Sequence, residues 1–306
     1  MRTRKRSNCR SLIERSHLAA HFSLRVLRLT PVPPRRIPVI AMHPAVSSAI
    51  DPRTSFCVML HDVAPCFEAE VDEFARVLGP LVGTAISAAV VPCWGGKPLD
   101  DADRPFLERV ARNYGNIQLH GCEHFRPTGR GLVSLFASGK DEMNGLDATE
   151  TDRRLELGQS LLTRYFGRPA TGFIAPTYQV GLATPGCLAR HGIHYTVGYR
   201  GITCSSGAAT PIATWIWDVS PIKLLCRAGY RLGELQHRFR PGVLPCVTLH
   251  PLDLQRRFLP QITRTVEKLL LEGRTPRLLE SHGYGQAPAA PADESSVPPR
   301  TPPRAN

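Results

Sequence analysis

The chain has 306 residues, enough for one large domain or two small ones, and its 42% hydrophobic content can build a sizeable core. With 21% charged and 7% aromatic residues, its composition excludes wholesale disorder and a coiled coil. No stretch approaches the ~18 uncharged apolar residues that a membrane-spanning helix requires, so no membrane span is expected.

The net charge of +12 is concentrated near the start of the chain. Residues 1–41 carry ten Lys or Arg against a single acid, Glu14, and so account for +9 of the total. Residues 283–306 are balanced, which leaves +3 for residues 42–282. A basic tail can bind polyanions without specificity. Because the middle of the chain shows no basic stripe with interleaved aromatics, we expect no specific nucleic-acid partner.

The two ends of the chain are expected to lie outside the fold. Residues 1–50 superficially resemble an organellar transit peptide, being rich in Arg and poor in acids. An untranslated upstream segment with a start at Met42 is the plainer alternative, and both interpretations exclude residues 1–50 from the domain. Residues 283–306 are mostly Pro, Ala and Ser, which predicts a disordered tail. A single domain is therefore expected over residues 51–282.

The nine cysteines are scattered singly, with no CxxC pair. This spacing predicts neither a structural zinc site nor a redox pair. An odd number of cysteines spread through predicted strands is typical of reduced thiols that pack as small hydrophobes in a reducing compartment. Since the first forty residues also lack the continuous apolar core of a secretory signal, we expect a cytoplasmic protein.

Short apolar or β-branched runs alternate with longer helical stretches in the middle of the chain. The predicted strands are Phe56–Leu60, Thr84–Val91, Asn116–His120, Gly172–Ala175, His194–Val197, Thr214–Trp217 and Cys246–His250. The predicted helices are Glu68–Leu78, Ala102–Tyr114, Thr149–Tyr165, Thr184–His191 and Leu254–Glu272, with Ile222–Phe239 as a candidate sixth.

This alternation predicts an α/β fold with parallel strands and crossover helices, as in a barrel or an open sheet. No GxGxxG or GxxxxGK[ST] follows the first strand, which disfavours the nucleotide-binding forms of the open sheet. Seven strands over about 230 residues favour a (β/α) barrel.

Polar residues stand at the ends of several predicted strands. The first strand runs into His61 and Asp62, the third into His120 with His124 in the following loop, and the last into His250. Because the carboxyl ends of parallel strands meet on one face of a barrel, we interpret these residues as one site. Any one of the histidines alone would be interpreted as structural.

A metal site follows from the residue types in this set. In HGCEH, His120 and His124 are four residues apart, and in a helical or turn-like segment both rings lie on one side, about 6 Å apart. Asp62 would complete a set of two histidines and one carboxylate that leaves positions open for water and substrate. Taken alone, Asp62 would instead be a helix cap or an Asx-turn residue.

Five motifs together resemble the polysaccharide-deacetylase superfamily of NodB-homology proteins, most of all its DUF2334 branch. They are HDVAP at 61–65, VVPCWGGKPL at 90–99, QLHGCEH at 118–124, GFIAPTY at 172–178 and TLHPLD at 248–253. The resemblance covers residues 55–272. It implies a single NodB-like domain with a distorted (β/α)7 barrel. It also implies one divalent metal ion, usually zinc, and hydrolysis of N-acetyl groups on carbohydrates.

The resemblance also implies roles for single residues. Asp62, His120 and His124 match the metal ligands, and His250 matches the general acid. Two positions depart from the family: His61 stands where its members have the acid that serves as general base, and Ile174 stands in place of an arginine.

Physically, a neutral imidazole at His61, with an intrinsic pKa near ~6.5, could take a proton from the attacking water. The alternative is that His61 only fixes the orientation of Asp62. The expected substrate contacts are Trp94, Pro176, Tyr178 and Asp218, of which the aromatic rings could stack on sugars.

The function that these observations predict is metal-dependent hydrolysis of a carbon–nitrogen bond, with a carbohydrate N-acetyl group as the favoured substrate. The alternatives are hydrolysis of another small amide or ester, and a catalytically silent barrel that binds glycan or protein. The Gly-rich segment Phe125–Gly145 is either a mobile loop that covers the substrate or an ordinary surface loop.

Overall fold

The computed structural model describes residues 51–125, 141–218, 223–240 and 242–281. The predicted tails, 1–50 and 283–306, lie outside the described residues, so the expected domain limits stay predictions.

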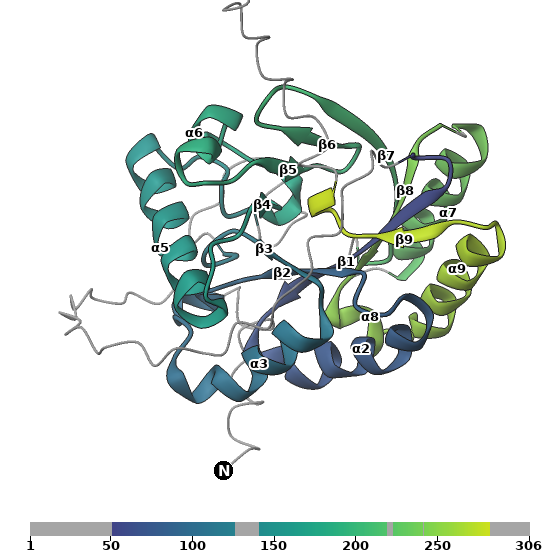
Figure 1. Ribbon diagram of the computed structural model, residues 1–306, viewed down its shortest axis with the longest axis horizontal. Coiled ribbons are helices and arrows are strands. Elements are labelled where there is room, and N and C mark those ends of the chain that lie inside the picture. The colour runs from purple at the N-terminus through teal and green to yellow at the C-terminus, as the bar shows by residue number, and fades with distance from the viewer. Residues whose placement is uncertain (1–50, 126–140, 219–222, 241, 282–306) are drawn as a thin grey trace, which may run out of the picture.

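Eight strands close into a barrel at the centre of the molecule (Figure 1). They are β1 (Ser55–Val63), β2 (Ile86–Val90), β3 (Asn116–Leu119), β4 (Gly172–Phe173), β5 (Tyr195–Val197), β6 (Gly201–Cys204), β7 (Ala209–Ile216) and β8 (Leu244–Leu249). Each strand pairs with the next, and β1 pairs with both β2 and β8, which closes the ring. All pairs are parallel except β5–β6 and β6–β7. The predicted α/β barrel is confirmed.

Helices surround the strands on the outside (Figure 1). They are α2 (Glu68–Val82), α3 (Arg104–Asn113), α5 (Ala148–Phe166), α6 (Pro185–Arg190), α7 (Lys223–Phe239), α8 (Pro251–Gln255) and α9 (Leu259–Leu271). The predicted helix over 254–272 is wrong at its start, because the helix is interrupted between α8 and α9. Arg257 has a φ of 65° at this break, and α9 begins with a proline in its first turn, where a missing N–H costs nothing.

Two short strands were not predicted from the sequence. β6 and the first half of β7 form an antiparallel hairpin, which inserts an eighth strand between β5 and β7. β9 (Thr275–Arg277) pairs with the start of β1 outside the ring. With four and three residues, and with Pro276 inside β9, neither is long enough to show the alternation by which strands are recognised.

The residues of β1 alternate between two layers of the core. Cys57 and Met59 belong to a small cluster that contains strand and loop residues only. Phe56, Val58 and Leu60 belong to a larger cluster that also contains residues of the surrounding helices. Since successive side chains of a strand point to opposite faces, the small cluster fills the barrel and the large one lies between strands and helices.

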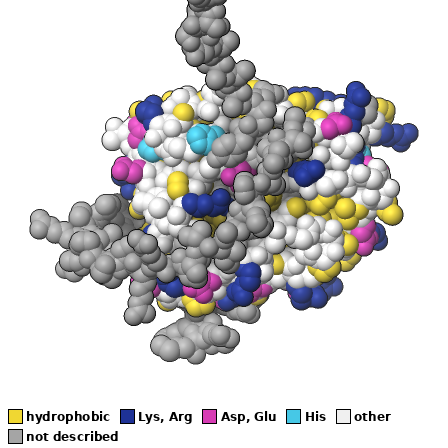
Figure 2. Space-filling view, in the orientation of Figure 1, with side chains coloured by type: hydrophobic (Ala, Val, Ile, Leu, Met, Phe, Trp, Pro, Cys, Tyr) yellow, Lys and Arg dark blue, Asp and Glu magenta, His cyan; other side chains and the backbone are white. Residues whose placement is uncertain are grey.

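None of the described helices is long and apolar enough to span a membrane. Among the described residues visible in Figure 2, Lys and Arg side chains are interspersed with Asp and Glu.

Candidate metal centre at the barrel mouth

The side-chain alternation of β1 and β8 brings two of the predicted histidines together. Met59 of β1 is in register with Thr248 of β8, so both residues point into the barrel. His61 and His250 each follow two residues later and so point the same way, at the carboxyl ends of their strands. Their ring centroids are 4.9 Å apart.

Asp62 reaches the same place through a break in the register of β1. The pairing with β2 shifts between Leu60 and Val63, and Asp62 has a φ of 56°. A bulge of this kind re-aims a side chain that regular pleating would turn away from the barrel. One carboxylate oxygen of Asp62, Oδ1, lies 3.1 Å from Nε2 of His120 and 2.8 Å from Nε2 of His124. The structure thus brings all three predicted metal ligands together, and all three are buried.

The hydrogen bond on the far side of the His120 ring fixes what its inner nitrogen can do. Nδ1 of His120 lies 2.7 Å from the carbonyl oxygen of Ile174, which can only accept, so Nδ1 carries the proton. In the neutral ring, Nε2 is then an acceptor that faces the Asp62 carboxylate. Two acceptors at this distance are held favourably by a cation bound to both or by a second proton on the ring.

These donors fit a divalent metal ion. Two imidazole nitrogens and one carboxylate oxygen form a ligand set that zinc enzymes use, with a backbone carbonyl orienting one of the rings. Ile174, whose side chain is buried and apolar, contributes through its main chain only.

Opposing electrostatic effects act on the two adjacent residues of β1. Burial alone would raise the pKa of Asp62, but the charge of His124 and the polar contacts with the rings of His120 and His124 outweigh it, and this pKa lies well below its usual range. Burial, followed by the neighbouring His120 and His250, holds the pKa of His61 well below its usual value. Asp62 is therefore ionised and His61 is a neutral imidazole.

The ring of His61 lies close to three other rings at the barrel mouth, the end of the barrel where the carboxyl ends of β1, β3 and β8 meet. Its ring lies 4.7 Å from that of His120 and 5.6 Å from that of Tyr178, measured between centroids. Its Nε2 is buried and has no hydrogen-bond partner within the described ranges. A buried polar atom without a partner is costly, so this nitrogen is placed to bond a group that is not part of the chain.

His250 is held by an aspartate that the sequence analysis did not single out. The backbone N–H of His250 donates to Oδ2 of Asp253 at 2.8 Å, and Nδ1 of the ring lies 3.9 Å from the same oxygen. Burial, followed by the charge of Asp218, raises the pKa of Asp253 well above its usual value. Asp253 stands three residues after His250, which directly precedes α8, and an acid at this spacing is typical of a helix start. This pattern could have revealed Asp253 in the sequence.

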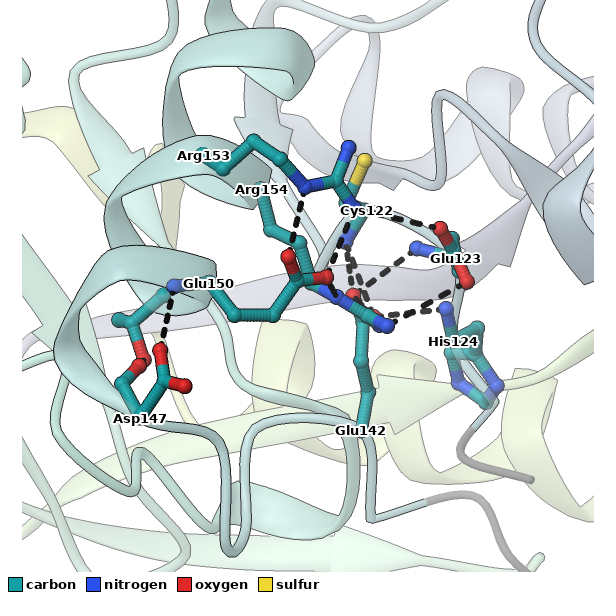
Figure 3. Close-up of polar contacts among 9 residues, drawn as sticks. Cys122, Glu123, His124, Glu142, Asp147, Glu150, Arg153 and Arg154 are labelled. Atoms are coloured by element: carbon teal, nitrogen blue, oxygen red, sulfur yellow. Dashed lines mark hydrogen bonds and ion pairs between the residues drawn. The ribbon is translucent and has the colours of Figure 1, made fainter. Parts of the chain in front are cut away.

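The loop that carries His124 is anchored by a buried carboxylate, Glu142 (Figure 3). Its oxygens accept from the backbone N–H groups of Cys122 at 2.9 Å, Glu123 at 3.0 Å and His124 at 2.7 Å. The charge of Glu142 is balanced by Arg154 of α5, whose Nη1 lies 2.8 Å away. Together these contacts fix the backbone of residues 122–124.

Glycine is required at position 121 by the same arrangement. Gly121 has a φ of 62°, and a Cβ at this position would lie 2.3 Å from Oε2 of Glu142 and 2.9 Å from Cγ of Pro176. The Gly that follows the first histidine of HGCEH therefore lets the loop close over the Glu142 carboxylate.

The sequence offered two interpretations of the segment Phe125–Gly145, a mobile loop that covers the substrate and an ordinary surface loop. Residues 126–140 lie outside the described part of the chain, so both interpretations stay predictions. Residues 141–143, which include Glu142, are fully buried. Oε2 of Glu123 lies 3.5 Å from Nη2 of Arg154. Burial raises the pKa of Glu123.

Backbone strain is concentrated at the barrel mouth. Five non-glycine residues have positive φ within the described ranges, and four of them lie here: Asp62, His124, Thr177 and Tyr178. Such conformations cost about 1–3 kcal/mol each and persist where the surrounding structure enforces them. For His124 the enforcing contact is the one from its N–H to Glu142.

Two of the four predicted substrate residues pack tightly against the ligand set. Trp94 is buried and stacks on the ring of His124, with centroids 4.9 Å apart, so that one face of the indole is already used. Pro176 is buried beside Gly121. Both residues support the site, and their contact with a substrate stays a prediction.

The other two predicted substrate residues, Tyr178 and Asp218, differ in their contacts. Tyr178 is half-buried next to His61, and its hydroxyl lies 3.5 Å from Oγ1 of Thr248. Asp218 forms an ion pair with Arg256 at 2.5 Å. Because a guanidinium already neutralises Asp218, this carboxylate is less available to a substrate than the sequence pattern indicates.

Comparison with known proteins gives distant structural likenesses only. No protein-family model matches the chain, and no curated protein matches it. Similar solved structures include a family 4 carbohydrate esterase from Streptomyces lividans, 12% identical with a TM-score of 0.47, which covers 77% of this chain and 97% of that one. A CE4 family pseudoenzyme from Bacillus anthracis is 10% identical with a TM-score of 0.47, covering 76% and 67%. The peptidoglycan deacetylase PdaC from Bacillus subtilis is 14% identical with a TM-score of 0.43, covering 76% and 92%. Likenesses at this level establish no activity for this chain.

Proposed function

We propose that this protein is a metal-dependent hydrolase of an amide bond, with the N-acetyl group of a carbohydrate as its substrate. The observation that carries the proposal is the convergence of His120 and His124 on one oxygen of Asp62, at 3.1 and 2.8 Å, beside two further imidazoles. Membership of the polysaccharide-deacetylase superfamily, and of its DUF2334 branch, is proposed on the five sequence motifs.

Asp62, His120 and His124 would hold the metal ion, and zinc is the proposed ion because it takes imidazole and carboxylate ligands with a position left open. A bound divalent ion supplies Lewis-acid polarisation of the amide carbonyl and makes water more acidic. Amide hydrolysis also needs a base for the proton of water and an acid for the departing nitrogen.

The remaining histidines are placed for these two proton transfers. His61, neutral and with a buried Nε2 that has no partner among the described residues, accepts a proton as water adds to the carbonyl carbon. His250, whose ring lies 4.9 Å from that of His61, donates a proton to the nitrogen as the C–N bond breaks. The products are acetate and a free amine.

The activity is tested by acetate release from N-acetylated oligosaccharides with zinc-loaded and with chelator-treated protein. Metal-dependent acetate release supports the proposal, and release from O-acetyl esters alone would reassign the site to an esterase. Stoichiometric metal binding without turnover on either substrate class would identify a silent binding barrel.

His61→Ala is expected to lower kcat by about 10²–10⁴-fold while metal binding stays unchanged, because the proton acceptor is lost and the ligands are kept. The measurement pairs acetate release with metal content. His194→Ala, which removes an exposed histidine just before β5, is the matched control and should change neither quantity. If metal affinity falls by about 10–100-fold and activity returns at saturating zinc, then His61 only orients Asp62.

His250→Ala is expected to produce a loss of similar size, about 10²–10⁴-fold, with metal content preserved. A substrate with a good leaving group separates the role of His250 as acid from the role of His61 as base, because the departing atom of such a substrate needs no proton. The deficit of His250→Ala should shrink on such a substrate, whereas the deficit of His61→Ala should persist. Equal deficits of His250→Ala on both substrates would argue against its role as general acid.

A further inference from the structure

A second group of metal-binding side chains lies away from the barrel mouth, where α5 and α6 face each other (Figure 1). It consists of Asp152 on α5, Cys187 on α6 and His191, the residue that ends α6. One ligand atom of each residue lies within 4.8 Å of the others. Within the described ranges, only this group and the barrel-mouth group meet this condition.

The local sequence explains why these three residues meet. Thr184 caps α6 by accepting from the N–H of Cys187 at 3.3 Å, and Cys187 and His191 are four residues apart, on one side of the helix. The end of α6 is tied to α5, since Nε2 of Gln159 donates to the carbonyl oxygen of His191 at 2.8 Å. Asp152 lies seven residues before Gln159, on the same face of α5.

The donors converge on a single oxygen. Oδ1 of Asp152 accepts from Sγ of Cys187 at 3.4 Å and lies 2.8 Å from Nε2 of His191. Nη2 of Arg190 also contacts Asp152, at 3.1 Å from Oδ1 and 3.3 Å from Oδ2. A thiol, an imidazole and a guanidinium thus share one carboxylate, whose side chain is 41% exposed.

We propose that Cys187, His191 and Asp152 form a second divalent-metal site, with zinc as the cation, that fastens α6 to α5. Thiolate, imidazole and carboxylate are the three ligand types of protein-bound zinc, and tetrahedral ligands at zinc distances lie about 3.3–3.8 Å apart. The thiolate and the carboxylate together balance the charge of the ion. The thiol proton is released to solvent on binding, and the exposed side of Asp152 leaves room for water as the fourth ligand.

A nucleophilic role for Cys187 fits the contacts less well. An activated cysteine hydrogen-bonds to an imidazole that takes its proton, whereas Sγ of Cys187 donates to a carboxylate. The contacts of Cys187 therefore favour a role as a metal ligand over a role as a nucleophile.

Cobalt titration of the full chain tests the proposal, because Co²⁺ bound to a thiolate gives a charge-transfer absorption that imidazole and carboxylate ligands do not. The barrel-mouth ligands include no thiolate, so this absorption reports on the second site. We expect the band in the wild type and in His120→Ala. Cys187→Ser should lose the band and one equivalent of metal. His191→Gln should weaken the metal affinity by more than about 100-fold, which exceeds the loss expected when a residue that only orients a ligand is removed.

Cys204→Ser is the matched control, because Cys204 is as buried as Cys187 (7% and 6% exposed) but lies in no such group. It should keep the band and the metal. Absence of the band from the wild type, or its survival in Cys187→Ser, would overturn the proposal. Zinc should also raise the Tm of His120→Ala, whose mouth site is disabled, and this rise should vanish when Cys187→Ser is added. No rise in His120→Ala would count against the site even if Cys187→Ser alone fails to fold. Failure of the proposed hydrolase would leave these results unchanged.

Discussion

His120→Ala is expected to abolish metal binding at the barrel mouth and to lower hydrolysis by more than about 10³-fold, since metal ions contribute several kcal/mol of transition-state stabilisation. The expectation rests on two contacts of this side chain: Nε2 lies 3.1 Å from Asp62 and Nδ1 lies 2.7 Å from the carbonyl oxygen of Ile174. Removing the ring takes away one of three ligands and leaves a buried carbonyl without its donor.

Metal content at equilibrium, acetate release and far-UV circular dichroism, measured on one preparation, separate loss of the metal from loss of the fold. Asp62→Asn keeps the side-chain volume and should also lose the metal, because the amide has no charge to offer. His194→Ala should retain both metal and rate. Retention of the mouth metal and of the rate by His120→Ala would show that the three residues are not its ligands.

The barrel could be predicted from the sequence because its strands are buried and its helices are periodic. Each of the seven predicted strands overlaps a strand of the ring. The hairpin formed by β6 and the start of β7 was missed because its pairing is local and antiparallel, and four residues carry too little pattern. The break between α8 and α9 was missed because apolar spacing continues across it, while the positive φ of Arg257 is set by tertiary contacts.

The positions of the histidines were predictable for a simple reason. A residue that follows a buried strand by one or two positions inherits its side-chain alternation, so His61 and His250 had to appear at the barrel mouth once the strands were known. The direction of Asp62 was not predictable, because regular alternation would place it on the opposite face from His61. The bulge that turns it inward is visible only in the register between β1 and β2.

The supporting carboxylates escaped the sequence analysis for a different reason. Glu142 lies in a segment without periodicity, 18 residues from the histidine whose backbone it holds. Its importance arises from a tertiary contact with three N–H groups that no local pattern encodes. Asp218 shows a related effect. This carboxylate at a strand end was expected to face the substrate, and it forms an ion pair with Arg256, which ends α8 38 residues further along the chain. No local pattern encodes that contact.

Glu142→Ala is expected to lower the free energy of unfolding by about 3–5 kcal/mol, the cost of removing one partner of a buried ion pair. The Glu142 side chain is fully buried and that of Arg154 is 8% exposed, so the guanidinium would lose a partner that water cannot easily replace. The N–H groups of Cys122, Glu123 and His124 would lose their acceptor at the same time. Denaturant titration followed by tryptophan fluorescence measures the change.

The same substitution should weaken metal binding, because the left-handed backbone of His124 is enforced by its bond to Glu142. We expect a loss of affinity of about 10–100-fold, the usual effect of removing a group that orients a ligand. Glu142→Gln keeps the volume and one acceptor oxygen, so it should fold in conditions where the alanine variant does not and should show the smaller affinity loss.

Glu156→Ala, which removes an exposed carboxylate from α5, is the matched control and should stay within about 0.5 kcal/mol of the wild type. If Glu142 anchors the loop, then stability and metal affinity should fall together in both Glu142 variants. Both losses should be larger in Glu142→Ala than in Glu142→Gln. If stability falls while metal affinity stays at the wild-type value, then Glu142 supports the fold only. The geometry of His124 must in that case be set by its stacking on Trp94.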